Sequence, residues 1–169
     1  LSFHMTRAGI LALLAGTAFS CTAWPSEEGR VQEAFDRVRF LFEEYNKAHD
    51  KQDDAALEII AGDLRRVAEA EFDVFVWELA EGDPVRQGYS AFVLGFSERP
   101  AAAPALLAQT VHPNVTVRAN ALLALGNLAA PDTSMEPFRK FLGDPMPQLR
   151  IAALFALRPL AGPADAIGM

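Results

Sequence analysis

The chain has 169 residues, of which 51% are apolar, 22% are charged and one is a cysteine. This apolar content supports a packed core and excludes disorder throughout, while a single cysteine excludes an internal disulfide framework. Fifteen Lys and Arg against 22 Asp and Glu give a net charge of −7, which disfavours a basic groove for nucleic acid. Residues 27–83 hold 17 acids and seven bases, whereas residues 84–169 hold five acids and seven bases. We therefore expect two sub-regions with different surfaces.

The N-terminal segment carries the pattern of an export signal. Arg7 precedes an uncharged and mostly apolar run over residues 8–19, which matches a signal-peptide core and is too short to span a bilayer. Small residues then precede Cys21, and this arrangement resembles a bacterial lipobox with Ala18 in place of the usual leucine. We therefore predict that residues 1–25 form a leader and tether, with lipid on Cys21, and that the protein is anchored in the periplasm or cell envelope. Plain secretion and a buried N-terminal helix are the alternatives.

Residues 26–82 are predicted to form an N-terminal helical cap. The first helix covers residues 27–49, with Ser26 as N-cap and acids in the first turn, where carboxylates suit the helix dipole. Apolar residues recur in it at steps of three and four, and they are Val31, Phe35, Val38, Phe42 and Tyr45. Acids on the other side give this end of the fold a polar outer face.

A second helical stretch begins at Asp53 or Asp54 and continues to about residue 80. We expect Gly62 to break it and Asp63 to cap a new helix. Residues 72–77, Phe-Asp-Val-Phe-Val-Trp, are strand-prone by composition. Helical sequence on both sides and the absence of a hairpin partner favour a helix over a strand at this position.

From residue 83 the sequence repeats with a period of 31–32 residues. The three similar segments cover residues 83–95, 112–126 and 144–157. Each contains an arginine, and these are Arg86, Arg118 and Arg150. In the first copy, an alternative alignment places Gln87 instead of Arg86 in the arginine position. Each segment predicts a helix of about fifteen residues, then a turn and a second helix of about ten residues, at 101–110 and 134–142.

The repeated segments resemble the short bacterial HEAT repeats that also occur in phycobilisome-lyase-like proteins. The family pattern is Asp-Pro, then Val-Arg, then an Ala-rich helix that ends in Ala-Leu-Gly. The copy over residues 112–128 fits this pattern best, through Pro113, Val117, Arg118, Ala121, Ala124, Leu125 and Gly126. In the third copy Arg158 stands where glycine is expected. We expect the second helix of that copy, which starts near residue 162, to be cut off because the natural chain runs on.

The resemblance covers residues 83–169 and implies an all-α fold. It implies a right-handed α-solenoid of the HEAT/armadillo type, with about three repeats behind the helical cap. A single helix pair cannot bury its apolar face, so such pairs stack and share one continuous core.

No pattern typical of an enzyme occurs in the sequence. It has no Gly-rich phosphate loop, nucleophile elbow or zinc-protease motif, and its three histidines lack metal-ligand spacing. We therefore predict a non-enzymatic protein–protein interaction or scaffold module of the envelope, with a protein or peptide partner and a lipid as its only membrane contact. No cofactor, metal, nucleic acid or small-molecule substrate is expected. The resemblance leaves one alternative, a lyase-like or chaperone-like helper of a cofactor-attaching or protein-modifying enzyme.

Candidate partner-binding residues lie on two segments. Asn127 follows Ala-Leu-Gly in a sequence similar to the armadillo motif, whose asparagine clamps an extended peptide, and a plain polar helix end is the alternative. The second helices are expected to line the concave face, where Arg139 and Lys140 place cations beside Phe138. Phe138 and Phe141 are three residues apart, and we expect one of them to pack inward. Ordinary helix surface is the alternative for this segment.

The repeat arginines Arg118 and Arg150 allow two interpretations. They either form a cationic ladder for an anionic ligand, or pair with an aspartate of the same or an adjacent repeat and stabilise the stack. We favour the structural interpretation, because ion pairs within repeats are mostly structural.

Overall fold

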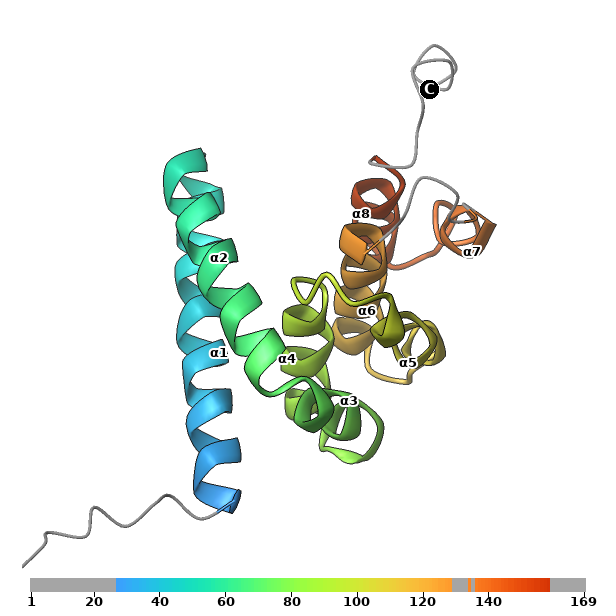
Figure 1. Cartoon of the computed structure of the whole chain (residues 1–169). Coiled ribbons are helices and arrows are strands. Elements are labelled where there is room, and N and C mark those ends of the chain that lie inside the picture. Colours follow the sequence, from blue (N-terminus) through green and yellow to red (C-terminus); the bar gives the residue numbers. More distant parts are fainter. Residues whose placement is uncertain (1–26, 129–133, 135, 159–169) are drawn as a thin grey trace, which may run out of the picture.

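The computed structural model describes residues 27–128, 134 and 136–158, and these residues form only helices and turns (Figure 1). The elements are α1 (Glu27–Asp50), α2 (Asp54–Ala70), α3 (Phe72–Glu81), α4 (Pro84–Leu94), the 3₁₀ turn η1 (Pro100–Ala102), α5 (Ala103–Gln109), α6 (Val115–Leu128), α7 (Glu136–Arg139) and α8 (Pro147–Leu157). The all-α prediction is confirmed. Cys21, the leader predicted over residues 1–25 and the helix expected near residue 162 lie outside the described residues. None of the helices within the described part has the length and apolarity needed to cross a bilayer.

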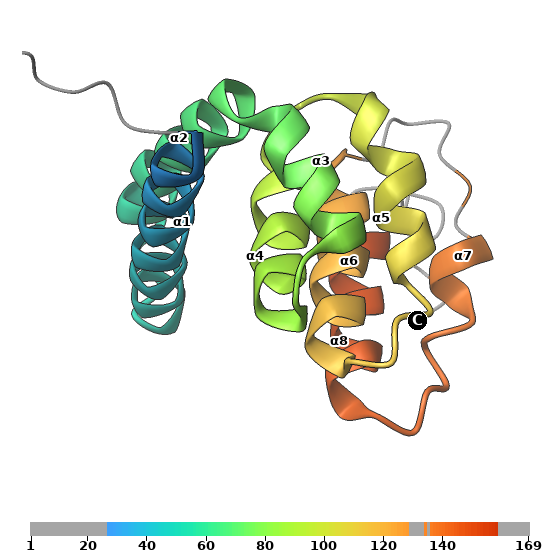
Figure 2. The ribbon, with the colours of Figure 1, turned by 90° about the horizontal axis from the view of Figure 1, so that it is seen from below.

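The helices after α2 form a stack of two layers. Each of α3, α5 and α7 packs against the helix that follows it, which gives the pairs α3/α4, α5/α6 and α7/α8. The second members, α4, α6 and α8, lie side by side in one layer, and the first members lie in the other layer (Figure 2). This stack of helix pairs confirms the predicted helical-repeat architecture.

Polar side chains begin several of these helices. Each accepts a hydrogen bond of 2.8–3.0 Å from a backbone N–H two or three residues ahead, and they are Asp53, Asp83 and Asn114. Such caps satisfy donors that the first turn of a helix leaves without a partner. The turns between repeats therefore stop one helix and start the next through local chemistry.

Glycine permits the close approach between neighbouring helices of the α4/α6/α8 layer. A Cβ added at Gly95 would lie 2.8 Å from the Cα of Ala124, and one added at Gly126 would lie closer still to the Cα of Ala156. Because those neighbours are backbone atoms in a close-packed interior, any larger residue must push the helices apart. The glycine that ends the first two copies is thus a packing requirement.

Large aromatic side chains join the α1/α2 hairpin to α4. Phe42 lies edge-to-face with Tyr89 and Phe92, and Tyr45 lies edge-to-face with Phe92 and Phe96, with ring centroids 4.8–5.7 Å apart. Aromatic pairs favour this geometry, and each ring also buries a large apolar area. The aromatic joint, defined here as these five rings, fixes α1 against the first edge of the stack.

A polar contact reinforces this connection. Arg86 Nη1 donates to Oε1 of the buried Glu78 at 2.5 Å, and its Nη2 donates to Oε1 of Gln32 at 3.2 Å. The same guanidinium lies 5.0 Å from the centroid of the Phe35 ring. A buried carboxylate is costly without such a partner, so Arg86 couples α1, α3 and α4.

Gly62 does not break the second helix, which corrects the expectation from the sequence. A glycine inside a helix costs only about 1 kcal/mol relative to alanine. Burial of the following apolar face outweighs this cost, through Leu64, Val67 and Ala68. The chain instead changes direction at Glu71, whose φ and ψ are −123° and 32°. The helix expected over residues 72–77 is confirmed as part of α3.

The helices α5 and α7 are shorter than the ten residues expected. Helix α5 has seven residues behind η1, and α7 has four residues. Pro104 and Pro137 stand at the second residue of each helix, where proline is tolerated because it has no N–H to donate. Each helix therefore begins one residue before its proline and extends only a short way beyond it.

Candidate functional site

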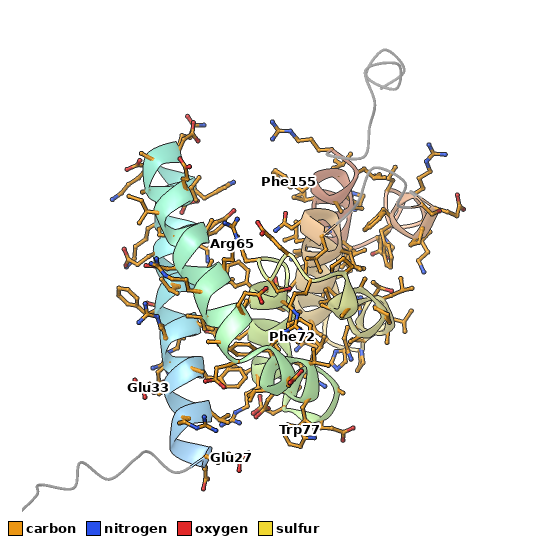
Figure 3. The ribbon with its side chains drawn as sticks, in the orientation of Figure 1. Glu27, Glu33, Arg65, Phe72, Trp77 and Phe155 are labelled. Carbon is orange, nitrogen blue, oxygen red and sulfur yellow. The ribbon has the colours of Figure 1, made fainter. Side chains whose placement is uncertain are left out.

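A groove with a volume of about 910 Å³ lies between the α1/α2 hairpin and α8, with α4 and α6 at its base. Figure 3 shows Phe155 on the side of α8 that is turned towards α2. The groove is formed by side chains from five helices that are spread along the sequence, so no single segment encodes it.

The base of the groove is largely apolar. Phe92 and Phe96 of the aromatic joint line it together with Leu123 of α6. Asn120, also at the base, donates from Nδ2 to the carbonyl oxygen of Gly88 at 2.9 Å and so links α6 to α4. Because this amide is engaged within the fold, Asn120 holds two helices together at the base of the groove.

The α8 wall exposes large apolar side chains. Ile151 and Phe155 are four residues apart on one face of the helix, and they are 54% and 49% exposed. Gln148 and Arg158 stand at either end of this row, and neither side chain has a hydrogen-bond or ion-pair partner among the described residues. Exposed apolar residues flanked by unpaired polar groups are typical of a surface that binds a partner.

The opposite wall is formed by the end of α1 and the start of α2. Asn46, His49 and Asp54 line it, and none of their side chains has a partner among the residues that the structure describes. Tyr45 stands below them, and its partial burial raises the pKa of its phenol above the usual value near 10. Just outside the wall, Lys47 pairs with Glu44 at 2.8 Å, and this hydrogen bond raises the pKa of its ammonium group.

A family model described as HEAT repeats matches residues 72–158, from the start of α3 to the residue after α8. The chain belongs to the HEAT-repeat family. HEAT repeats generally mediate protein–protein interaction or scaffolding, and the family is typically non-catalytic. None of the curated proteins matches the chain.

One of the two phenylalanines near α7 is placed differently from the expectation that only one of them packs inward. Phe138 and Phe141 are both buried, at 2% and 7% exposure, so it is wrong that one of them faces solvent. Their packing is needed because α7 is one short turn and can hold its position against α8 only through large anchors.

Among the candidate partner-binding residues, only Asn127 reaches the groove. Its side chain is exposed and has no partner in the described part of the chain. Arg139 and Lys140 are exposed, but they lie at α7, in the layer away from the groove. The helices expected to line the concave face therefore do not line the groove, and a role of Arg139 and Lys140 in binding stays a prediction.

The HEAT-repeat arginines bind carbonyl groups of their own turns. Arg118 Nη1 donates to the carbonyl oxygen of His112 at 2.6 Å, and Arg150 Nη1 donates to that of Asp144 at 2.8 Å. This corrects the expectation of pairing with aspartate side chains: the carboxylate of Asp144 instead accepts a hydrogen bond from the backbone N–H of Met146. No cationic ladder faces the groove from these two positions.

The structure also distinguishes the two alignments of the first HEAT copy. Gln87 is buried and donates from Nε2 to the carbonyl oxygen of Ala80 at 3.5 Å, which resembles the side-chain-to-carbonyl contacts of Arg118 and Arg150. Arg86 instead pairs with Glu78. Gln87 is therefore the structural counterpart of the later arginines.

The sequence alone did not reveal the groove. Within the described residues, no group of three or more His, Cys, Asp and Glu is placed to hold a metal ion. The overlooked signal is the row of Ile151 and Phe155 in a helix whose alanines form the packed face. Large apolar residues on the side away from that face indicate a second contact surface.

Proposed function

We propose that the chain is a non-enzymatic protein-binding or scaffold module of the bacterial cell envelope, and that its partner binds in the groove. The observation that carries the proposal is the exposed row of Ile151 and Phe155 beside unpaired polar side chains. An apolar centre with a polar rim is the usual composition of a protein-binding surface. The general role of HEAT repeats in protein interaction supports the same assignment.

The envelope address is supported by the sequence that precedes α1. An apolar run follows Arg7 and ends at Cys21, as expected of an exported lipoprotein. Mass spectrometry of the N-terminus of the native protein tests this part. We expect a chain that starts at lipid-modified Cys21, and an unprocessed chain that still carries Arg7 would contradict export.

Site-specific photo-crosslinking in the source organism tests the binding function. A benzophenone amino acid at Phe155 is expected to capture a defined partner, because this side chain projects into the groove. The matched control carries the same group at Val111, which is 74% exposed and does not line the groove. A partner captured equally well from both positions, or from Val111 alone, would argue against the groove.

A further inference from the structure

We infer that the groove accepts an amphipathic helix of a protein partner, with an apolar stripe against α8 and with Lys or Arg along the edge that faces the α1/α2 hairpin. This inference rests on the proposed protein-binding function and adds the conformation and charge of the bound segment. It follows from three features of the chain: the free face of α8, the residue at position 158, and the charge of the α1/α2 turn.

The free face of α8 has the residues that a helix packs against. One repeat earlier, Leu122 of α6, which corresponds to Leu154, is buried, and Gly126, which corresponds to Arg158, lies directly against Ala156 of α8. On α8 the same face presents Ile151, Leu154 and Phe155, each about half exposed. Their spacing of three and four residues forms a ridge of the kind that fits the grooves of a second helix.

Arg158 decides which kind of helix can occupy this face. It stands at the repeat position that Gly95 occupies directly after α4 and that Gly126 occupies within α6. Each of these glycines allows an alanine of the next helix to touch its backbone. Any side chain at this position prevents that crossing, and arginine prevents it most effectively. The occupant is therefore not another repeat packed in the same way, but a helix that lies further out, across the groove.

The charge of the opposite wall gives the bound helix its basic edge. From Asp50 to Glu58 the α1/α2 turn, which contains this wall, carries four exposed acids and one exposed base, and of these Asp54 lines the groove itself. The acids are Asp50, Asp53, Asp54 and Glu58, and the base is Lys51. This wall belongs to the strongly acidic region of the chain, so a segment with Lys or Arg on that side is attracted and an acidic one is repelled.

Model peptides test this inference on the purified full chain. The probe is a fluorescein-labelled peptide of about 15 residues made of Leu and Lys, with Leu at helical spacing. One comparison peptide replaces Lys by Glu and keeps the apolar stripe, and another keeps the composition but scrambles the stripe. We expect fluorescence anisotropy to show binding of the helical Leu/Lys peptide that is at least about tenfold tighter than binding of either comparison peptide.

Paired variants locate the binding. The double change Ile151→Ser with Phe155→Ser is expected to weaken binding by about tenfold or more through lost apolar contact. The control, Leu107→Ser with Val111→Ser, removes exposed apolar residues outside the groove and is expected to change binding by less than about twofold. Equal losses in both variants would overturn the placement in the groove.

A second pair of variants, each of which removes two negative charges, tests the charge of the α1/α2 turn. Asp50→Asn with Glu58→Gln is expected to weaken binding by about threefold, while Glu33→Gln with Asp73→Asn, exposed acids elsewhere, leaves it unchanged. Equal binding of the Leu/Glu peptide would overturn the basic edge, and equal binding of the scrambled peptide would overturn the helix. If either occurs while Phe155 still captures a partner by crosslinking, the protein-binding function stands and only the partner chemistry is wrong.

Discussion

The two halves of the molecule are packed by opposite means. In the repeat stack, glycine and alanine bring helices so close that backbone touches backbone, as at Gly126 and Ala156. In the joint between α1 and α4, rings of Phe42, Tyr45 and Phe92 fill a wider space. Small residues fix distance and angle tightly, whereas large rings supply buried area and tolerate adjustment. We therefore expect added side-chain volume to destabilise the stack most, and lost side-chain volume to destabilise the joint most.

The largest expected effect is that of adding one methyl group to the stack. Gly126→Ala should lower the free energy of unfolding by about 3 kcal/mol, because the new Cβ collides with the backbone of Ala156. Chemical denaturation of the purified protein measures this change. The matched control is Gly62→Ala in α2, where no atom lies within 4 Å, and it should stabilise by about 0.5–1 kcal/mol. If both substitutions changed the free energy of unfolding in the same direction, the close packing of the stack at Gly126 would be contradicted.

Removing a ring from the aromatic joint should have the next largest effect. Phe42→Ala deletes edge-to-face contacts with Tyr89 and Phe92 and should cost about 2 kcal/mol, less than for a fully buried phenylalanine. Hydrogen exchange should show faster exchange in α1 and α2 while α6 stays protected, because the stack keeps its own contacts. Uniformly faster exchange in all helices would mean that the joint and the stack unfold as one unit.

Removing a buried hydroxyl group from the stack should have a smaller effect on stability. Ser90 in α4 is fully buried, and its Oγ is the one buried side-chain polar atom without a partner among the described residues. Ser90→Ala keeps the small size that the layer needs and removes an unsatisfied hydroxyl, so it should stabilise by about 1 kcal/mol. Ser90→Val, which adds volume at the same place, should destabilise. A midpoint of urea denaturation that falls for the alanine variant would show that the hydroxyl has a partner after all.

The smallest effect concerns alkaline pH and the aromatic joint. Burial raises the pKa of Tyr45 above the unfolded value near 10, so the folded state disfavours the phenolate. This contribution to stability is fully present below pH 10 and is lost as the pH rises through the raised pKa. Denaturation midpoints measured between about pH 9 and 11 should fall less steeply for Tyr45→Phe than for the wild type. Because the side chain is only half buried, the difference is small.

The sequence predicted the elements that depend on local or periodic signals. The 32-residue spacing of Arg118 and Arg150 located α6 and α8, and the apolar steps from Val31 to Tyr45 located α1. The helix break expected at Gly62 does not occur, because intrinsic helix propensity is a weak effect that burial of an apolar face outweighs. Helix propensity was therefore a poor guide at Gly62, whereas the periodicity of apolar residues located the helices correctly.

The groove could not be predicted in the same way. It depends on contacts such as Tyr45 with Phe96, which join residues far apart in the sequence and have no periodic signature. Asn127 was found because a motif pointed to it, whereas the apolar row of Ile151 and Phe155 was overlooked, and its place in the groove is known only once the packing of α8 is known. Surface sites made by several helices require the tertiary arrangement, which local patterns do not encode.

The contacts of Arg118 and Arg150 bear on how such a chain can change length over evolution. Each guanidinium is satisfied by carbonyl groups within its own turn, the first between α5 and α6 and the second between α7 and α8. A duplicated or deleted repeat therefore takes its charge and its partners with it and leaves no orphaned ion in a neighbour. Glu78 has no such independence, because its buried carboxylate needs the guanidinium group of Arg86 as a partner. Duplication is thus tolerated among the later repeats and opposed at the join to α1.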